Sequence, residues 1–275
     1  MSDRVRFTLS AFADEISSDL DVQIRTLLTL GISGLDLRSV DDINVVKLSE
    51  DDLKRVADKT RESGLLVQAI GSPVNKVPYS SAARPEEFDK LKKSIHAANL
   101  TGTKRIRLFT PEADDADETK VLAWMREQIL LAADHDIVLL HENDGRFWGA
   151  FPDHAQRLFG ELGGPNFKAA FDFANTVLIG YRPIPDWFPW LLPHLDTIHI
   201  KDAIRAEGKV VPAGEGEGEL GPTLAWLMEQ GWNGTLTLEP HLSAAGPMGG
   251  YSGEQLFGVA TNALRAVLTQ IGATA

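Results

Sequence analysis

Eight short apolar segments recur along this chain, and longer segments with helical periodicity separate them. The apolar segments span residues 7–11, 34–38, 65–70, 105–109, 137–141, 167–172, 197–201 and 235–239. Strands that alternate with helices of this length are typical of β–α–β units, whose neighbouring strands run parallel. Eight such units within 275 residues predict an α/β fold, a single (β/α)8 TIM barrel, rather than an open sheet.

The segments between these strands carry helix start and stop signals. Amphipathic helices are predicted at residues 50–63, 85–100, 119–134 and 222–230. Ser49 and Asp52 have the spacing of a capping box, and Gly64 and Gly231 follow the last residues of two helices. No linker rich in Pro, Gly or Ser divides the chain, so residues 1–275 are predicted to form one domain.

Composition narrows the class of protein. No apolar run approaches the roughly 18 residues that a membrane span needs. The chain has no cysteine, which excludes disulfides and thiolate metal sites, and its first residues lack the pattern of a signal peptide. These features predict a cytoplasmic protein with no membrane partner. With 27 basic and 39 acidic residues the net charge is −12, which disfavours a nucleic-acid partner because phosphate binding depends on Lys and Arg.

Four consecutive predicted strands end in residues that bind divalent metals: Glu142, Asp172, His199 and Glu239. The carboxyl ends of TIM-barrel strands form the mouth of the active site. In three of these strands, an inward-facing ligand leaves its apolar neighbours facing the helices, whereas segment 137–141 is apolar throughout and does not discriminate. Each residue alone has a structural alternative, a helix cap or a buried core histidine. Together they predict one divalent ion, with Mn²⁺ preferred and Mg²⁺, Co²⁺ or Zn²⁺ as alternatives.

Five segments resemble one group of known proteins. In chain order they read LLHEN, FDFAN, IHIKDA, VVPAGEGEGE and LTLEPHL. They are similar to the sugar phosphate isomerase/epimerase group of the xylose-isomerase-like TIM-barrel (AP endonuclease family 2) superfamily. The resemblance covers nearly the whole chain, and its most specific parts are His-x-Lys-Asp at 199–202 and Gly-Glu-Gly at 214–216.

The resemblance implies roles for individual residues. In this family a strand-end Glu, Asp, His and Glu hold a single divalent ion, and the matching residues are Glu142, Asp172, His199 and Glu239. By the same resemblance, Glu142 and Glu239 are also the catalytic proton-transfer groups. Asn175 departs from the pattern, because many members carry histidine there and the endonuclease branch needs further histidines for its metal cluster. This departure and the acidic charge predict no role in DNA repair.

The predicted site suits proton abstraction from a sugar. A divalent ion polarises a carbonyl and acidifies the adjacent C–H, so that one carboxylate removes the proton to give an enediolate and another returns it. This predicts a sugar isomerase or epimerase. The alternative is a lyase, eliminase or deglycosidase on 3-keto sugars or 3-keto-glycosides, and a third reading is a non-catalytic sugar-binding subunit. No phosphate cradle is visible, which favours a free sugar or keto sugar; a homo-oligomer or a partner subunit stays open.

Four further residues are predicted to contact the substrate: Lys201, Arg38, His141 and His241. Lys201 and Arg38 have inward parity in their strands, and His241 follows Glu239 by two residues. His141 has opposite parity to Glu142, which favours a supporting or loop-side role; if the strand twists or bulges there, it becomes a candidate base. Arg107 has inward parity but lies deeper, where a structural role is the alternative.

Two loop features complete the prediction. The glycine-rich loop 212–221 is expected to close over substrate, with mobile glycines and a polar contact from Glu215; a solvated flexible loop is the alternative. Aromatic residues after the fifth and sixth strands suit either a sugar-binding rim or packing of the loops onto helices. They are Phe147, Trp148, Phe151, Trp187, Phe188 and Trp190.

Overall fold

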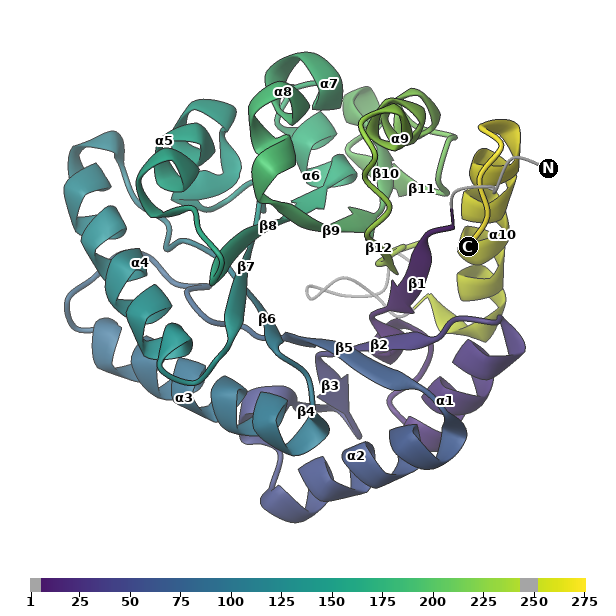
Figure 1. The fold of residues 1–275 in the computed structure, drawn as a ribbon, viewed down its shortest axis with the longest axis horizontal. Helices are drawn as coiled ribbons and strands as arrows, with labels where there is room; N and C mark the ends of the chain where they lie inside the picture. The colour runs from purple at the N-terminus through teal and green to yellow at the C-terminus, as the bar shows by residue number, and fades with distance from the viewer. Residues whose placement is uncertain (1–5, 243–251) are drawn as a thin grey trace.

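Eight parallel strands form a barrel in the computed structural model, which describes residues 6–242 and 252–275 (Figure 1). The strands are β1 (Thr8–Ala11), β2 (Gly34–Leu37), β5 (Leu66–Gly71), β6 (Arg105–Leu108), β7 (Val138–Glu142), β8 (Phe167–Asp172), β9 (Leu195–Ile200) and β12 (Thr235–Leu238). They are paired in the order β1-β12-β9-β8-β7-β6-β5-β2. The ladder is open only between β1 and β2, where the backbone of Gly34 lies close to Ser10. The predicted TIM barrel is confirmed.

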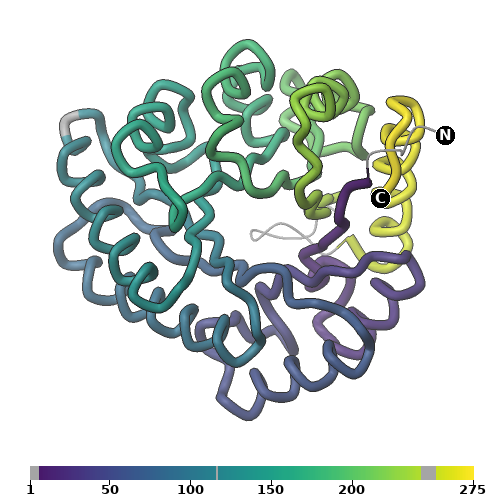
Figure 2. The backbone as a smooth tube through the Cα atoms, in the orientation of Figure 1, coloured from purple at the N-terminus to yellow at the C-terminus, as the bar shows by residue number. Residues whose placement is uncertain are grey.

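Helices surround the barrel and follow the strands in chain order (Figures 1 and 2). They are α1 (Leu20–Thr29), α2 (Glu50–Ser63), α3 (Arg84–Thr101), α4 (Glu118–Ala133), α5 (Pro152–Leu162), α6 (Phe173–Leu178), α7 (Pro183–Asp186), α8 (Phe188–Leu191), α9 (Leu220–Glu229) and α10 (Gly253–Gln270). The capping box of Ser49 and Asp52 is present, and Gly64 ends α2 with a φ of 76°. The four predicted helices are confirmed within two residues at each end.

The barrel wall separates an apolar outer side from a polar inner side. Leu236 and Leu238 of β12 and Ile198 of β9 pack in the hydrophobic core with helix residues such as Leu224. Thr237, which alternates with these leucines, pairs in register with His199 and donates to the Asp36 carboxylate at 3.3 Å. This alternation is expected from strand geometry, and it places polar side chains on the inner face of the barrel, up to the carboxyl ends of the strands.

Two short antiparallel pairs lie in loops that follow barrel strands and were not predicted. β3 (Ser39–Val40) pairs with β4 (Ile43–Asn44) after β2, and β10 (Asp202–Ile204) pairs with β11 (Lys209–Val211) after β9. Both pairs therefore begin at the carboxyl ends of strands, beside the mouth. None of the helices in residues 6–242 and 252–275 has the length and apolar character needed to cross a bilayer.

Candidate active site

Four buried side chains from neighbouring strands converge at the barrel mouth. Glu142 and Asp172 are the last residues of β7 and β8, His199 lies near the end of β9, and Glu239 follows β12. One potential ligand atom from each lies within 4.8 Å of the others. The His199 Nδ1 atom is 3.5 Å from Glu142 Oε2 and 3.4 Å from Glu239 Oε2. The structure thus brings together all four residues predicted as metal ligands.

The atoms that face one another in this cluster make no regular hydrogen bonds, although Lys201 and Arg107 form ion pairs with Asp172 and Glu142. These buried atoms are Glu142 Oε2, Asp172 Oδ2, Glu239 Oε2 and both ring nitrogens of His199. Buried polar atoms in folded proteins are nearly always hydrogen-bonded, so these atoms have unused capacity to bind a ligand. Three carboxylates and an imidazole form a donor set for a divalent cation. The residues present therefore fit such an ion.

The pKa values in the cluster reflect its dense negative charge. Burial disfavours the charged form of His199, but the carboxylates of Glu142 and Glu239 outweigh this and raise its pKa to about 10. Burial opposes ionisation of Glu142 as well, yet His199 and Arg107 lower its pKa to about 2. Burial raises the pKa of Asp172 to about 6, with Lys201 opposing the shift. A proton on His199 therefore supplies positive charge that the carboxylates require.

Lys201 reaches the same cluster from the residue after β9. Its Nζ atom lies 2.8 Å from Asp172 Oδ2 and 3.7 Å from Glu239 Oε2, and its side chain is 7% exposed. Burial alone lowers the pKa of this lysine, but Asp172 and Glu239 raise it above its ordinary value, so the side chain stays an ammonium. Its predicted inward direction agrees with this position.

Arg38 and His241 both contact the outer oxygen of Glu239. Arg38 Nη1 donates to Glu239 Oε1 at 2.8 Å, and His241 Nε2 lies 3.2 Å from the same oxygen. Arg38 Nε also donates to Asp14 Oδ2 at 2.7 Å. Both residues lie at the mouth as expected, but the guanidinium of Arg38 is occupied by carboxylates of the protein.

Sequence reasoning missed two acidic residues of the mouth, Asp14 and Glu15. They lie in the 3-10 turn that follows β1. Glu15 Oε2 accepts hydrogen bonds from the backbone N–H of His241 at 2.8 Å and from Ser252 Oγ at 3.2 Å. The segment SAFADE shows the same signal that identified Glu142, acidic residues that follow an apolar strand. Both residues could therefore have been predicted from the sequence.

A second group of possible ligands consists of Glu15, Glu239 and His241, whose ligand atoms also lie within 4.8 Å of one another. Arg38 lies against this group, with Nη2 3.6 Å from Glu15 Oε1 and Nη1 2.8 Å from Glu239 Oε1. The positive charge of the Arg38 guanidinium therefore occupies this second group in the structure.

Two residues contact Glu142, Arg107 from the neighbouring strand β6 and Asn175 from α6. Arg107 Nε forms an ion pair with Glu142 Oε2 at 3.1 Å, and Asn175 Nδ2 donates to Glu142 Oε1 at 3.3 Å. Arg107, for which a structural role was the alternative, thus lies directly against a predicted catalytic group. Asn175, the departure from the family pattern, faces the same carboxylate.

The predicted substrate contact of His141 does not agree with its position. The imidazole packs edge-on against Phe159 of α5, with ring centres 6.0 Å apart, and lies beside Phe167. The register of β7 with β6 and β8 is continuous at His141, so no bulge turns it inward. Burial lowers its pKa to about 4. His141 is a neutral residue between the barrel wall and the helix layer.

Loop 212–221, whose glycines were predicted to be mobile, is held in the structure through its backbone. The Asp202 carboxylate accepts backbone N–H groups of Gly214, Gly216 and Gly218 at 2.9, 3.0 and 2.9 Å. A Cβ on Gly216 would lie 2.4 Å from Asp202 Oδ1, so glycine is needed for close approach. Glu215 is exposed. The motif His-x-Lys-Asp therefore ends in the residue that fixes this loop.

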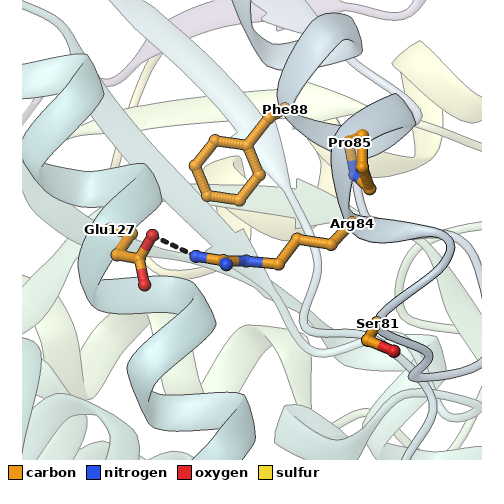
Figure 3. Close-up of a pocket in the computed structure, with 5 residues that line it drawn as sticks. All are labelled: Ser81, Arg84, Pro85, Phe88 and Glu127. Atoms are coloured by element: carbon orange, nitrogen blue, oxygen red, sulfur yellow. Dashed lines mark hydrogen bonds and ion pairs between the residues drawn. The ribbon is translucent and has the colours of Figure 1, made fainter.

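Most of the aromatic residues considered for a sugar-binding rim pack inside the molecule. Phe147, Trp148, Trp187 and Phe188 are at most 1% exposed, in agreement with the packing alternative, whereas Phe151 is 38% exposed. A separate pocket of about 300 Å³ lies at the outer surface between α3 and α4 (Figure 3). An ion pair between Arg84 and Glu127 crosses it, and none of its lining residues belongs to the mouth.

Comparisons with known proteins agree with this architecture. A probable 3-DHS dehydratase, AsbF from Bacillus anthracis, is 17% identical with a TM-score of 0.74, over 94% of this chain and 98% of its own. D-allulose 3-epimerase from Methylomonas sp., in complex with D-allulose, is 16% identical with a TM-score of 0.74, over 95% and 97%. A xylose isomerase-like TIM barrel protein from Mycobacterium smegmatis, in complex with magnesium, is 16% identical with a TM-score of 0.69, over 98% of each chain.

A comparison with curated proteins gave no match. The family model described as xylose isomerase-like TIM barrel matches residues 24–257, which is most of the chain and includes the four clustered ligand residues. The chain therefore belongs to the xylose isomerase-like TIM-barrel family.

Proposed function

We propose that this protein is a divalent-metal-dependent isomerase or epimerase of a free keto sugar. The observation that carries the proposal is the convergence of buried ligand atoms from Glu142, Asp172, His199 and Glu239 within 4.8 Å of one another. A solved relative of the same fold is named as a D-allulose 3-epimerase, and another contains magnesium. These relatives support a sugar substrate and a divalent ion for this chain.

Glu142 and Glu239 are proposed as the proton-transfer groups. A bound divalent ion supplies Lewis acidity, which acidifies a C–H bond next to a sugar carbonyl. Glu142 and Glu239 belong to strands on either side of the β8–β9 pair, so their carboxylates approach the cluster from different sides. One carboxylate removes a proton from a carbon and the other delivers a proton to the opposite face or to the neighbouring carbon. Lys201, held beside both Asp172 and Glu239, is placed to donate to a substrate oxygen.

The charges at the mouth favour an uncharged substrate. Each described lysine or arginine near the cluster is engaged by a carboxylate: Arg38 by Asp14 and Glu239, Arg107 by Glu142, Lys201 by Asp172, and Lys76 by Asp144 at 3.5 Å. Residues 243–251, outside the described part, contain no lysine or arginine. A phosphate group would therefore have to break existing ion pairs, which favours a free sugar over a sugar phosphate.

A second candidate is a lyase that uses the same first step. A relative of equal similarity in fold is named as a probable 3-DHS dehydratase. If a leaving group lies one carbon beyond the abstracted proton, the carbanion equivalent expels it in place of taking back a proton. The two candidates therefore share the metal ion and the base and differ in the substrate that the mouth accepts.

Exchange in D₂O tests and separates the two candidates. Protein loaded with Mn²⁺ is incubated with D-allulose, other ketoses and a set of 3-keto-glycosides, and the products are followed by NMR. Deuterium at one carbon of a ketose, with its epimer or isomer as product, supports the first candidate. Release of the aglycone or of water supports the second. Binding of less than about one equivalent of metal, with no exchange in any substrate, contradicts both.

A further inference from the structure

We propose that Arg38 and Arg107 are positioning residues, each of which holds one of the two glutamates, and that Phe12 supports both. The inference rests on the proposed roles of Glu142 and Glu239 and goes beyond them. It replaces the substrate contact predicted for Arg38 with a different task.

Arg107 is held by one hydrogen bond and one ion pair of its guanidinium. Its Nη1 donates to the carbonyl oxygen of Ser72 at 2.9 Å, while Nε lies 3.1 Å from Glu142 Oε2. The side chain is 4% exposed and its guanidinium lies over the Phe109 ring, 4.6 Å from the ring centre. With so little freedom, Arg107 defines where the Glu142 carboxylate sits.

Arg38 plays the same part for Glu239 on the other side of the mouth. It joins Asp14 and Glu239 through two short hydrogen bonds of 2.7 and 2.8 Å. Asp14 is itself held by Ser39 Oγ at 2.7 Å. Because Arg38 binds Oε1 of Glu239, the orphaned Oε2 is left directed at His199.

Phe12 lies between the two arginines. The guanidinium carbon of Arg38 is 4.8 Å from the centre of its ring and that of Arg107 is 5.3 Å away. The ring is fully buried and meets His199 edge-on at 5.2 Å and 87°. A Cβ on Gly71 would come within 2.6 Å of the ring, so this glycine provides its space. One aromatic side chain therefore couples the two arginines to the central histidine.

Planar guanidinium groups suit this task better than ammonium groups. A guanidinium donates in fixed directions and stacks on an aromatic face at the same time, which lysine does not reproduce. Residues that orient metal ligands and catalytic groups typically change metal affinity or activity by about 10- to 100-fold when they are replaced. Loss of either arginine should thus displace its glutamate without removing any group that touches the substrate.

The test measures catalysis and metal binding in Arg38→Gln and Arg107→Gln. We expect kcat to fall about 10²-fold, with KM changed far less, because the proton-transfer group is misplaced. The dissociation constant for Mn²⁺, measured by calorimetry, should rise about 10- to 100-fold. Lysine at either position should restore little, whereas added guanidinium should partly restore kcat of an Arg107→Ala variant.

Two further variants serve as matched controls. Arg105 lies two residues before Arg107 on β6, and its Nε donates to Asp196 Oδ1 at 2.8 Å, away from both glutamates. Arg105→Gln should keep both kcat and the Mn²⁺ affinity of the parent protein. Phe12→Leu removes the shared support without changing charge, so it should lower kcat and weaken Mn²⁺ binding although both arginines remain.

The outcomes separate this inference from the proposed function. An increase in KM with unchanged kcat and unchanged Mn²⁺ affinity would show that the arginines contact substrate, and would overturn the inference. If the parent protein turns over no sugar, the proposed function fails, while the Mn²⁺ affinities still test positioning. If a glutamine variant does not fold by circular dichroism, Phe12→Leu decides: parental kcat and Mn²⁺ affinity in that variant would contradict the inference.

Discussion

The charge on one imidazole at the barrel mouth depends on carboxylates from two other strands. His199 lies within 3.5 Å of both Glu142 and Glu239, and these contacts raise its pKa to about 10. A divalent ion and this proton compensate the same carboxylates, so they compete for the site. Proton binding and metal binding are therefore opposed at a single residue.

This competition predicts how stability changes with pH. The pKa of His199 is raised from 6.5 in the unfolded chain to about 10, so its stabilising contribution is complete below pH 6.5 and is lost as pH rises through 10. His241, with a pKa raised to about 9, has the same sign. We expect the melting temperature of chelator-treated protein to fall as the pH rises from 6.5 to 9. Over the same range, the rise in melting temperature caused by adding Mn²⁺ should become larger. Scanning calorimetry with and without Mn²⁺ measures both.

A histidine variant provides the control for this titration. His96 is exposed on α3, so His96→Asn should keep the pH dependence of the parent protein. A metal-induced increase that stays constant or shrinks from pH 6.5 to 9 would contradict competition between the proton and the ion.

Replacing either glutamate by its amide tests proton transfer. Glu142→Gln and Glu239→Gln keep the shape of the side chain but remove the base, so we expect turnover to fall by about 10²- to 10⁴-fold. Both residues lie at the mouth rather than in the apolar core, so far-ultraviolet circular dichroism should show a retained fold. Glu229→Gln, at an exposed position on α9, is the control. Near-parental turnover in one variant would remove that carboxylate from the mechanism.

At the scale of single residues, strand parity explains what was predictable. Asp172 ends β8, while His199 and Lys201 share inward parity at the end of the neighbouring β9, and the structure has all three facing one another. The contacts of Arg38 were not predictable, because its partner Asp14 lies 24 residues earlier, in the turn after β1. The sequence shows which side of the barrel a residue faces, but not which neighbour it meets there.

At the scale of elements, the strands and main helices follow from local periodicity, whereas the loop after β9 does not. Its conformation depends on Asp202, which accepts N–H groups from residues 12 to 16 positions later. A glycine-rich sequence suits both a mobile loop and a backbone that must pass close to a carboxylate. Only the fold distinguishes these two possibilities, because the carboxylate belongs to Asp202, which lies outside the glycine-rich segment.

The role of Asp202 leads to a prediction for this loop. Asp202→Ala leaves the N–H groups of Gly214, Gly216 and Gly218 without their acceptor, so we expect a loss of stability of about 2–3 kcal/mol. Amide hydrogen exchange at the three glycines should accelerate in the same variant, and urea unfolding measures the stability. Glu215→Ala, at an exposed neighbour, should change stability by less than about 0.5 kcal/mol. Unchanged exchange at the glycines would contradict this role.

At the scale of the whole molecule, the protein is an acidic barrel whose mouth is lined by polar side chains. The net charge is −12, and the arginines and lysines nearest the mouth are paired with carboxylates of the described chain. A nucleic-acid backbone requires unpaired basic side chains along its path, since binding strength comes from the phosphates that they neutralise. The same charges that favour a neutral sugar therefore disfavour DNA.

The relation to AP endonuclease family 2 makes DNA the sharpest test at this scale. We expect no shift of a duplex with an abasic site in gel electrophoresis, even at low salt, because negative charges dominate the protein surface. We also expect no incision with Zn²⁺ or Mn²⁺, since Asn175, which contacts Glu142, stands where the family resemblance predicts a histidine. Glu142→Gln distinguishes a contaminating nuclease from this protein, because only an activity of this site would disappear in the variant. Metal-dependent incision that the variant abolishes would overturn the sugar substrate.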